Sequence, residues 1–316
     1  MLTLGRFSYP RPVILLAPMA GVSDLPFRRL CQANGADYST AEMVSAKPDL
    51  LHTDLAQNRL QFDPDPHYPK IVQLVGGDPA LMAEAALVMQ AKGADIIDIN
   101  LGCPAKIVAR QQAGSALLAD LGQVAKILAA VSRAVSIPVT VKTRLGYHDD
   151  QPTLFELAAI AEDNGVAALA VHGRSRAQKY NGTADHAAIG ALKNRTRLPI
   201  IANGDIRDAA QAKSLIDRYG FDGLMIGRAA LGDPWLFARC QAAVNGIPTP
   251  AADKNAQIRT HLRDLHQHYG AQATRIARKH LHAYLREHPA YAALRDAINH
   301  AADLAAQCAV LNSAAI

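Results

Sequence analysis

The sequence is poor in cysteine, with only four among its 316 residues. Cys31, Cys103, Cys240 and Cys308 lie far apart, and no two of them form a Cys-x-x-Cys pair. This spacing argues against a zinc site and against a disulfide framework. We therefore expect no bound metal and a reducing, cytoplasmic environment for the chain.

Long hydrophobic runs are absent as well. No stretch approaches the roughly 18 apolar residues that a membrane span needs, so we expect no membrane partner. The first apolar run starts at Val13 and is broken at Pro18, so no signal peptide is expected. Half of the residues are hydrophobic and 19% are charged, which is ordinary for a soluble globular enzyme. The net charge of +5 is compatible with an acidic partner.

What the sequence does contain is an alternation of short apolar segments and amphipathic segments. The apolar segments, predicted to be strands, are 13–17, 37–42, 70–75, 95–101, 138–144, 167–172, 199–202 and 222–226. The amphipathic segments, predicted to be helices, are 23–34, 79–92, 120–135, 153–164, 184–195 and 208–219. Ser23 is the expected cap of the first helix. Eight strands alternating with helices predict an α/β fold, the (β/α)₈ TIM barrel. A doubly wound sheet is the alternative, but no Gly-x-Gly-x-x-Gly follows the first strand.

The pattern changes near the C-terminal end of the chain. The segment 245–250 has the composition of a linker, and beyond it strand signals vanish. Three helices are predicted there, over 254–269, 274–288 and 291–313. We therefore predict a barrel domain over 1–243 and a small all-helical domain over 244–316.

The stretch 96–106 holds the most informative motif. It begins as a buried strand in which Asp98 and Asn100 recur at period 2, so both polar side chains point to one face. Polar groups on the inner face of a strand are costly unless they are paired. The strand stops at Gly102, and Cys103 follows on a loop, where a thiol can react. The simpler interpretation is that Cys103 is a small buried hydrophobic residue, and its neighbours have to decide.

In a barrel, functional residues gather at the C-terminal ends of the strands. Seven of these ends carry polar groups or glycine: Ala17–Gly21, Gln73, Asn100–Pro104, Lys142–Arg144, His172–Arg174, Asn203–Asp205 and Gly227–Ala229. Loops after strands seven and eight commonly hold phosphate, and Gly204 and Gly227 allow the close backbone approach that this needs. Arg228 adds a matching charge. Asn203-Gly204 alone is an ordinary turn, but seven strand ends in a row with polar groups or glycine indicate a functional rim. The loops after strands seven and eight favour a phosphate-bearing cofactor there.

Lys142 narrows the choice of cofactor. It lies inside an apolar strand, so its ammonium requires a negative charge nearby. The anionic pyrimidine side of a reduced flavin meets this requirement. Pyridoxal phosphate, which forms a Schiff base with a lysine, is the alternative. Gln73 favours flavin, because an amide can both donate to and accept from the edge of the ring system.

Together these motifs resemble those of the tRNA-dihydrouridine synthase family, and within it the bacterial B-type branch. The resemblance extends from about Ala17 to Leu285, with the motifs in the expected order. Its most specific part is Asn-Leu-Gly-Cys-Pro over 100–104 followed by Gly-Ser-Ala-Leu-Leu over 114–118. The other matching motifs are Ala-Pro-Met-Ala-Gly over 17–21, Val-His-Gly-Arg over 171–174, Ala-Asn-Gly-Asp over 202–205 and Met-Ile-Gly-Arg-Ala over 225–229.

The resemblance implies an enzyme that uses FMN, reduced by NADPH, to saturate the C5–C6 bond of a uridine in tRNA. It implies that Cys103 is the general acid, because a proton donor must relieve the negative charge that hydride delivery to C6 builds on the uracil. The implied FMN contacts are Pro18, Met19 and Ala20 beside the flavin, Gln73 and Lys142 at its ring, and His172, Asn203, Gly204, Asp205, Gly227 and Arg228 around the ring edge, ribityl chain and phosphate.

A tRNA partner requires basic side chains near the thiol, because phosphate contacts dominate nucleic-acid affinity. The target uridine must also leave its stack, and Asn100 is the candidate for orienting it. The basic candidates are Lys106 and Arg110 beside the thiol loop, Arg174 and Arg176 after the sixth strand, and Arg275, Arg278 and Lys279 in the helical segment. A solvated helix face is the simpler interpretation of the last three, but basic loops on the barrel rim favour an RNA groove.

Two other functions stay open at this point. A flavin barrel acting on a free pyrimidine, such as a dihydroorotate-type dehydrogenase, would share the phosphate site without needing a basic helical domain. A non-catalytic RNA-binding scaffold would keep the barrel and lose the chemistry, and the presence of Cys103, Lys142 and His172 argues against it. We expect the chain to be a monomer.

Overall fold

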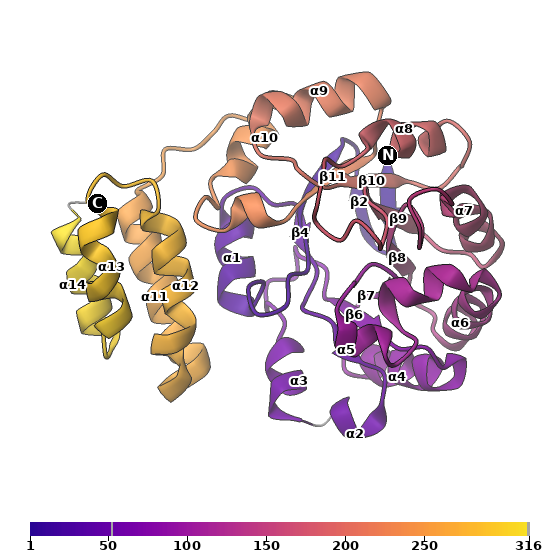
Figure 1. Ribbon diagram of the computed structural model, residues 1–316, viewed down its shortest axis with the longest axis horizontal. Coiled ribbons are helices and arrows are strands. Elements are labelled where there is room, and N and C mark those ends of the chain that lie inside the picture. Colours follow the sequence, from indigo (N-terminus) through magenta and orange to yellow (C-terminus); the bar gives the residue numbers. More distant parts are fainter. Residues whose placement is uncertain (52, 315–316) are drawn as a thin grey trace.

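The computed structural model describes residues 1–51 and 53–314, and its main body is the predicted TIM barrel (Figure 1). The barrel strands are β3 (Val13–Leu16), β4 (Tyr38–Ser39), β5 (Val44–Ser45), β6 (Ile71–Val75), β7 (Ile96–Asn100), β8 (Val139–Arg144), β9 (Ala168–His172), β10 (Ile200–Asn203) and β11 (Gly223–Ile226). Neighbouring strands pair in parallel, in the order β4-β3-β11-β10-β9-β8-β7-β6-β5. Because β4 and β5 belong to one short segment and Thr40 bridges Ile71, the sheet closes on itself. Each predicted strand is confirmed.

Helices cover the outside of the barrel (Figure 1). They are α1 (Leu25–Ala33), α4 (Pro79–Ala91), α6 (Leu121–Ala134), α7 (Leu154–Asp163), α8 (His186–Lys193), α9 (Ala209–Tyr219) and α10 (Leu236–Asn245). The first six confirm the predicted helices, whereas α10 and the short helices α2 (Pro48–Leu51), α3 (Asp54–Arg59) and α5 (Lys106–Ala109) are absent from the prediction. The predicted cap of α1 is wrong. Asp24 accepts the Phe27 N–H at 3.0 Å, while the Ser23 hydroxyl bonds to the Met19 backbone.

The barrel interior is layered, with an apolar layer below a polar one. An antiparallel hairpin of β1 (Leu2–Leu4) and β2 (Phe7–Tyr9) precedes the barrel, and Leu2 and Leu4 pack with residues at the N-terminal ends of the strands, Val13 and Ile96 among them. The hairpin therefore closes that end of the barrel. Nearer the C-terminal ends, the inward positions carry polar side chains: Gln73, Asp98, Asn100, Thr140, Lys142, His172 and Asn203.

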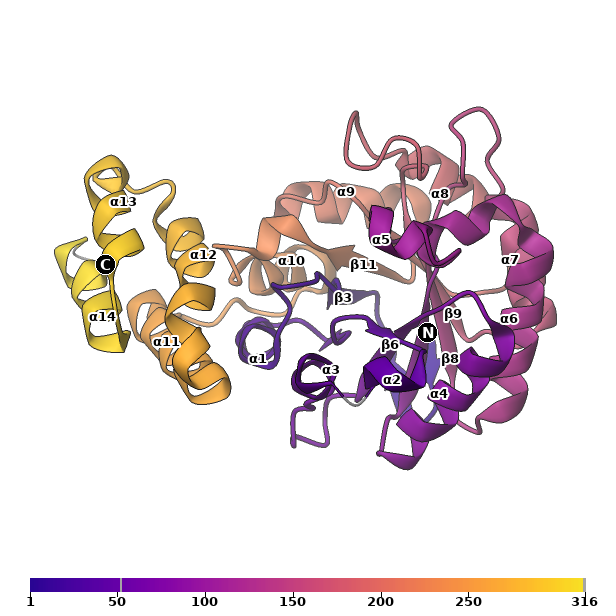
Figure 2. The same cartoon turned by 60° about the horizontal axis from the view of Figure 1, so that its bottom comes forward.

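Beyond the barrel, the described residues form four further helices, α11 (Lys254–Tyr269), α12 (Ala273–Leu285), α13 (Tyr291–His300) and α14 (Leu304–Ser313) (Figures 1 and 2). The single helix predicted over 291–313 is wrong. Asp303 accepts the Ala306 N–H at 2.8 Å and starts α14 as a separate helix. The break lets Ile298 of α13 and Leu311 of α14 enter the same buried cluster. The division at 243/244 stays a prediction, and α10 runs through Asn245.

The helical region packs against the barrel through α11 on α1, and through Trp235, the residue just before α10, which donates to Gln257 at 2.7 Å (Figure 2). The ring of Phe27 on α1 lies 5.7 Å from that of His261 and 5.2 Å from that of His280, measured between centroids. The Tyr269 hydroxyl donates to the Asp24 carboxylate at 3.2 Å. These contacts bring α12 next to the loop that follows β3, and so near the barrel mouth. No described helix has both the length and the apolar character to cross a membrane.

Candidate active site

Four polar side chains form a chain of hydrogen bonds inside the barrel. The Asp98 carboxylate accepts from the Thr140 hydroxyl at 2.7 Å and from the Gln73 amide at 2.6 Å. The Gln73 amide oxygen accepts from the Asn100 amide at 2.7 Å. Gln73 and Thr140 lie opposite Asp98 on the two neighbouring strands, which is why the three meet. Burial raises the pKa of Asp98, and the bonds from Gln73 and Thr140 act in the opposite direction.

The thiol loop, residues 101–105, is held from two sides. The side-chain oxygen of Asn100 accepts the N–H groups of Gly102 at 3.0 Å and Cys103 at 2.9 Å. The Cys103 carbonyl accepts from the Ser115 hydroxyl at 2.8 Å. Gly114 has a φ of +61°, and a Cβ there would lie 2.9 Å from the Cys103 carbonyl oxygen. The loop therefore presents Cys103, which is partly exposed, in a fixed position at the barrel mouth.

Lys142 reaches across the barrel to Asn203. Its ammonium donates to the Asn203 side-chain oxygen at 3.1 Å, and the Asn203 amide donates to the Met225 carbonyl at 2.7 Å. Burial, followed by the charge of Arg144, lowers the pKa of Lys142 to about 8, although the charge of Asp98 raises it. The ammonium is therefore mostly charged at neutral pH, and its one hydrogen-bond partner among the described side chains is neutral.

His172 is a neutral imidazole with a defined tautomer. The Arg174 guanidinium lies 3.1 Å from its Nε2, and because a guanidinium can only donate, Nε2 accepts and Nδ1 carries the proton. Burial, followed by the charges of Lys142 and Arg144, lowers the pKa of His172 to about 2. His172 therefore offers a hydrogen bond but no net charge at neutral pH.

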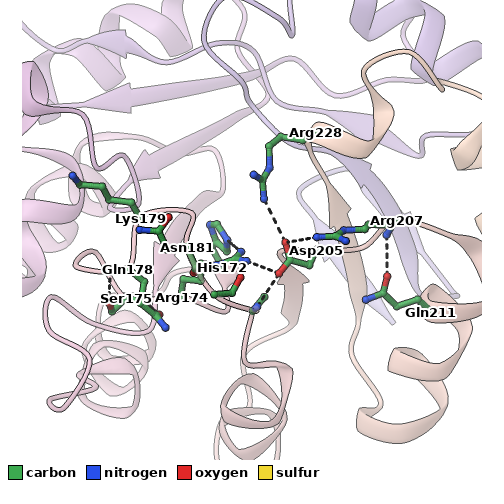
Figure 3. Close-up of polar contacts among 12 residues, drawn as sticks. His172, Arg174, Ser175, Gln178, Lys179, Asn181, Asp205, Arg207, Gln211 and Arg228 are labelled. Carbon is green, nitrogen blue, oxygen red and sulfur yellow. Dashed lines mark hydrogen bonds and ion pairs between the residues drawn. The ribbon is translucent and has the colours of Figure 1, made fainter. Parts of the chain in front are cut away.

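Asp205 gathers three arginines where the seventh and eighth barrel strands, β10 and β11, end (Figure 3). Its carboxylate lies 2.5 Å from Arg174, 3.4 Å from Arg228 and 3.9 Å from Arg207. Burial raises the pKa of Asp205, but the Ala184 N–H and the bond and charge of Arg174 lower it by more, so the net pKa is lowered. Three positive charges on one carboxylate leave an excess of positive charge. Within 1–51 and 53–314, no three His, Cys, Asp or Glu side chains gather as for a metal ion.

Two glycines bring loops close together beside this cluster. Gly204 has a φ of +116°, and a Cβ there would lie 2.7 Å from the Ala184 side chain and 2.9 Å from the His172 ring. A Cβ on Gly227 would lie 3.6 Å from the Met19 sulfur. The loop after β3, which carries the predicted cofactor residues Pro18, Met19 and Ala20, therefore faces the loop after β11.

Arg144 belongs to the site but is missing from the predicted site residues. It is 2% exposed and donates to the Gly102 carbonyl at 2.7 Å and to the Lys179 carbonyl at 2.7 Å. The ring of Tyr180 lies between Arg144 and Arg228, at 5.4 and 5.3 Å from their guanidinium carbons. The available signal was its period-2 spacing from Lys142, which places both side chains on the inner face of β8.

The basic residues predicted for the barrel rim differ in exposure. Lys106 and Arg110 are exposed on and beside α5, next to the thiol loop. Arg176 is partly buried, with its guanidinium 4.5 Å from the centre of the Tyr147 ring. Arg174 is only 1% exposed and bonds to Asp205 and to the carbonyls of 181 and 182 (Figure 3). Arg174 therefore supports the site from inside the protein rather than offering a free surface charge.

The basic residues predicted on α12 also point in different directions. Arg275 is exposed and Arg278 is partly buried. Lys279 is turned toward the barrel, where its ammonium donates to the carbonyl of Gly21 in the loop after β3. The N–H of Gly21 donates to Glu42 at 2.9 Å. Gly21, in the loop beside Met19 and Ala20, is thus held both by the barrel and by the helical region.

Comparisons with known proteins agree with one another. Residues 15–316 match the family model described as dihydrouridine synthase (Dus). The tRNA-dihydrouridine synthase B of Pectobacterium carotovorum is 42% identical over 315 residues, 98% of each chain. The protein of the same name from Pseudomonas aeruginosa is 44% identical over 311 residues, 97% of this chain and 93% of that one. The Escherichia coli K12 protein of that name is 42% identical over 315 residues, again 98% of each chain.

A solved structure supports the fold alone. The 6-hydroxypseudooxynicotine amine oxidase HisD from Pseudomonas geniculata N1 superposes with a TM-score of 0.54 at 13% sequence identity. The match covers 78% of this chain and 50% of that one.

Proposed function

The chain belongs to the dihydrouridine synthase family, and from this premise we propose that it reduces the C5–C6 bond of a uridine in tRNA, with FMN as its cofactor and NADPH as the reductant. The observation that carries the proposal is the thiol loop. Asn100 and Ser115 hold Cys103 at the mouth of a barrel whose opposite rim gathers arginines around Asp205. A proton donor and an anion site thus face one space from two sides.

The residues at the barrel mouth fit FMN. The positive charge around Asp205 suits a phosphate, and the open side of Gly227, where a Cβ would meet only Met19 and Ala17, leaves room between two loops. The residues proposed to hold FMN are Pro18, Met19, Ala20, Gln73, Lys142, His172, Asn203, Gly204, Asp205, Gly227 and Arg228. When bound and reduced, FMN supplies the hydride that adds to C6 of the uracil.

Cys103 is proposed to give its thiol proton to C5 of the uracil. A positioned general acid contributes roughly 10²–10⁴-fold in rate, and the bonds to the Cys103 N–H and carbonyl fix the loop that aims this thiol. Lys142, whose ammonium is mostly charged at neutral pH, would stabilise the negative charge of a reduced flavin bound there. His172 stays neutral, with Nε2 accepting from Arg174 and the proton on Nδ1, so it does not compete with Cys103 as the general acid.

Asn100 is proposed to contact the uracil as well. One hydrogen of its amide goes to Gln73, and the amide nitrogen also lies 3.6 Å from the sulfur of Met43. A thioether is a weak acceptor, so a carbonyl oxygen of the uracil would replace it favourably.

The helical region, residues 244–316, is proposed to bind tRNA together with the barrel rim. Lys106 and Arg110 lie beside the thiol loop, Arg176 lies in the loop after β9, and Arg275 and Arg278 lie on α12. Phosphate contacts from such residues supply affinity without reading sequence. The names of the relatives support tRNA as the partner, and no observation favours a free pyrimidine instead.

The Cys103→Ala variant tests the proposal. We expect it to retain FMN and to accept electrons from NADPH at the wild-type rate. The reduced protein should then form dihydrouridine in unmodified tRNA about 10²–10⁴ times more slowly, because only the proton donor is missing. Cys308→Ala, which removes the partly exposed thiol of α14, is the matched control and should behave as the wild type.

Two results would contradict the proposal. Wild-type modification of tRNA by Cys103→Ala would remove the proton-donor assignment. Oxidation of the reduced flavin by free uridine as fast as by tRNA would favour the free-pyrimidine enzyme.

A further inference from the structure

The hydrogen-bond chain below the thiol loop has only one possible direction. The N–H groups of Gly102 and Cys103 can only donate, so the Asn100 side chain must turn its oxygen toward them. Its NH₂ then faces Gln73, which must present its oxygen. The NH₂ of Gln73 is left on the far side and needs an acceptor there. The N–H groups of the loop therefore favour this orientation of both amides from one end of the hydrogen-bond chain, and the group at the other end has to match it.

Asp98 is the acceptor on which this chain ends. An ionised carboxylate accepts and never donates, so Asp98 is compatible with one direction of the chain only. It is 6% exposed, and its second oxygen accepts from the Thr140 hydroxyl at 2.7 Å. Asp98 lies two residues before Asn100 on β7, and the hydrogen bonds that connect their side chains pass through Gln73 on β6.

We propose that Asp98 is a positioning residue: by accepting from Gln73 and Thr140 it holds the amide chain in the direction that the loop requires, which keeps the Asn100 oxygen on the thiol loop and Cys103 in place. Its effect on the reaction rests on the proposed function, because the thiol matters only if Cys103 is the proton donor. The effect of Asp98 on the position of the thiol loop does not rest on the proposed function. The same orientation decides which atoms of Gln73 and Asn100 face the barrel mouth.

A purely electrostatic role is the competing explanation. Asp98 raises the pKa of Lys142, so its negative charge alone could be what the site needs. The two roles differ in their dependence on Thr140. In Asp98→Asn, the new amide can keep its oxygen toward Gln73 and turn its NH₂ toward Thr140, whose hydroxyl accepts as well as it donates. This variant therefore loses the negative charge but keeps the direction of the hydrogen-bond chain.

The two explanations separate in a double-mutant cycle. Asp98→Asn combined with Thr140→Val leaves the new NH₂ against a methyl group, so nothing holds the amide in one orientation. The reverse orientation turns Gln73 and Asn100 and sets an NH₂ against the N–H groups of the loop. Asp98→Asn with Thr140→Ser keeps the hydroxyl and is the matched control.

The readout is the rate at which iodoacetamide alkylates Cys103 in the apoprotein. A Cys308→Ser background isolates this thiol, because Cys31 and Cys240 are both buried. Intact mass and peptide mapping give the site, and a melting curve checks each variant. The proposal predicts single variants within about twofold of the wild type and a rise of at least about fivefold in Asp98→Asn/Thr140→Val. The Thr140→Ser control should match Asp98→Asn alone.

Three outcomes would overturn the proposal. They are a large change in Asp98→Asn with Thr140 intact, a double variant no more reactive than the two singles imply, and a Thr140→Ser control that fails to restore reactivity. If the double variant does not fold, Asp98→Ala, which removes the acceptor outright, must also raise the alkylation rate, and unchanged reactivity there overturns the idea.

The rate of dihydrouridine formation is measured on the same variants, and we expect it to fall where alkylation rises. Alkylation needs neither flavin nor tRNA. If the wild type modified no tRNA, the proposed function would fail while the alkylation cycle still decided the role of Asp98.

Discussion

The charge of Lys142 changes with pH just above neutrality. Folding lowers its pKa from 10.5 to about 8, so the unfolded chain holds more protons than the folded one between these values. This residue's contribution to stability therefore rises as the pH increases from 8 to 10.5. In the apoprotein, we expect NMR of the Lys142 side chain to show deprotonation near pH 8. A midpoint above 10 would contradict the burial that the structure gives it.

A cofactor whose ring accepts a hydrogen bond from Lys142 should shift this equilibrium. At pH 8.5 the apoprotein carries mostly neutral Lys142, and a hydrogen bond from the charged form raises the pKa of an ammonium. We therefore expect FMN binding at pH 8.5 to take up a proton, seen by calorimetry in two buffers of different ionisation enthalpy. Lys142→Met should abolish the proton uptake, whereas Arg228→Ala should weaken FMN binding but leave the proton uptake unchanged. Equal uptake in the Lys142→Met protein would place the proton elsewhere.

At the scale of elements, the packing of α11 and α12 on α1 should make the helical region sensitive to acid. Burial lowers the pKa of His261 to about 3 and that of His280 well below 6.5. Below pH 6.5 these histidines bind protons in the unfolded chain but not in the folded one. Lowering the pH to 5 therefore reduces the free energy of unfolding by about 2 kcal/mol per histidine. Asp24 opposes this trend, because burial raises its pKa to about 6 and the folded state then accepts the proton first. Lys279 adds to the trend through its positive charge.

His280→Leu tests that expectation. The leucine is similar in size and cannot be protonated, so the loss of stability between pH 7.5 and pH 5 should shrink by about 2 kcal/mol. Urea unfolding followed at the two pH values measures the difference. His300→Leu, at an exposed position of α13, is the control and should leave the pH dependence unchanged.

The same elements show what could be predicted from sequence. Strands such as β7 and β8 could be found because polar side chains alternate with β-branched apolar ones in each, a signal that does not depend on the rest of the fold. The break between α13 and α14 was missed because no glycine or proline lies within 291–313, and Asp303, the cap of α14, was the one local signal for it.

The residue types at the strand ends predicted where the site lies, but not which residues its charged side chains contact. Arg174 sits in a basic cluster in the sequence, yet its charge is taken by Asp205, which lies 31 residues later. Lys279 lies on a stripe of basic residues, yet its partner Gly21 is 258 residues away. Such long-range pairings leave no local pattern, so the direction in which a charged side chain points could not be derived from sequence.

At the scale of the whole molecule, these pairings divide the basic residues of α12 into two groups. Arg275 is exposed and Arg278 partly so, whereas Lys279 holds the loop that carries Met19 and Ala20. The double variant Arg275→Ala/Arg278→Ala should therefore weaken binding of tRNA whatever its sequence. It should also reduce the log–log salt dependence by about 1.4–1.8, since each lost phosphate contact removes about 0.7–0.9. Retention of FMN should not change.

Lys279→Met should have the opposite profile. A hydrogen bond to a charged group contributes about 1.5–3 kcal/mol, and losing part of it in the loop beside the flavin should raise the FMN dissociation constant roughly threefold to tenfold. The salt dependence of tRNA binding should stay close to that of the wild type, because this ammonium faces a carbonyl rather than solvent. Fluorescence titration of the apoprotein with FMN and filter binding of tRNA at several salt concentrations measure the two quantities on the same variants. If Lys279→Met lowered the salt dependence and kept FMN affinity, Lys279 would belong with Arg275 and Arg278, and the helical region would act on tRNA alone. If it behaves as expected, the helical region both docks the substrate and helps to shape the flavin site, and the barrel and the helices form one functional unit.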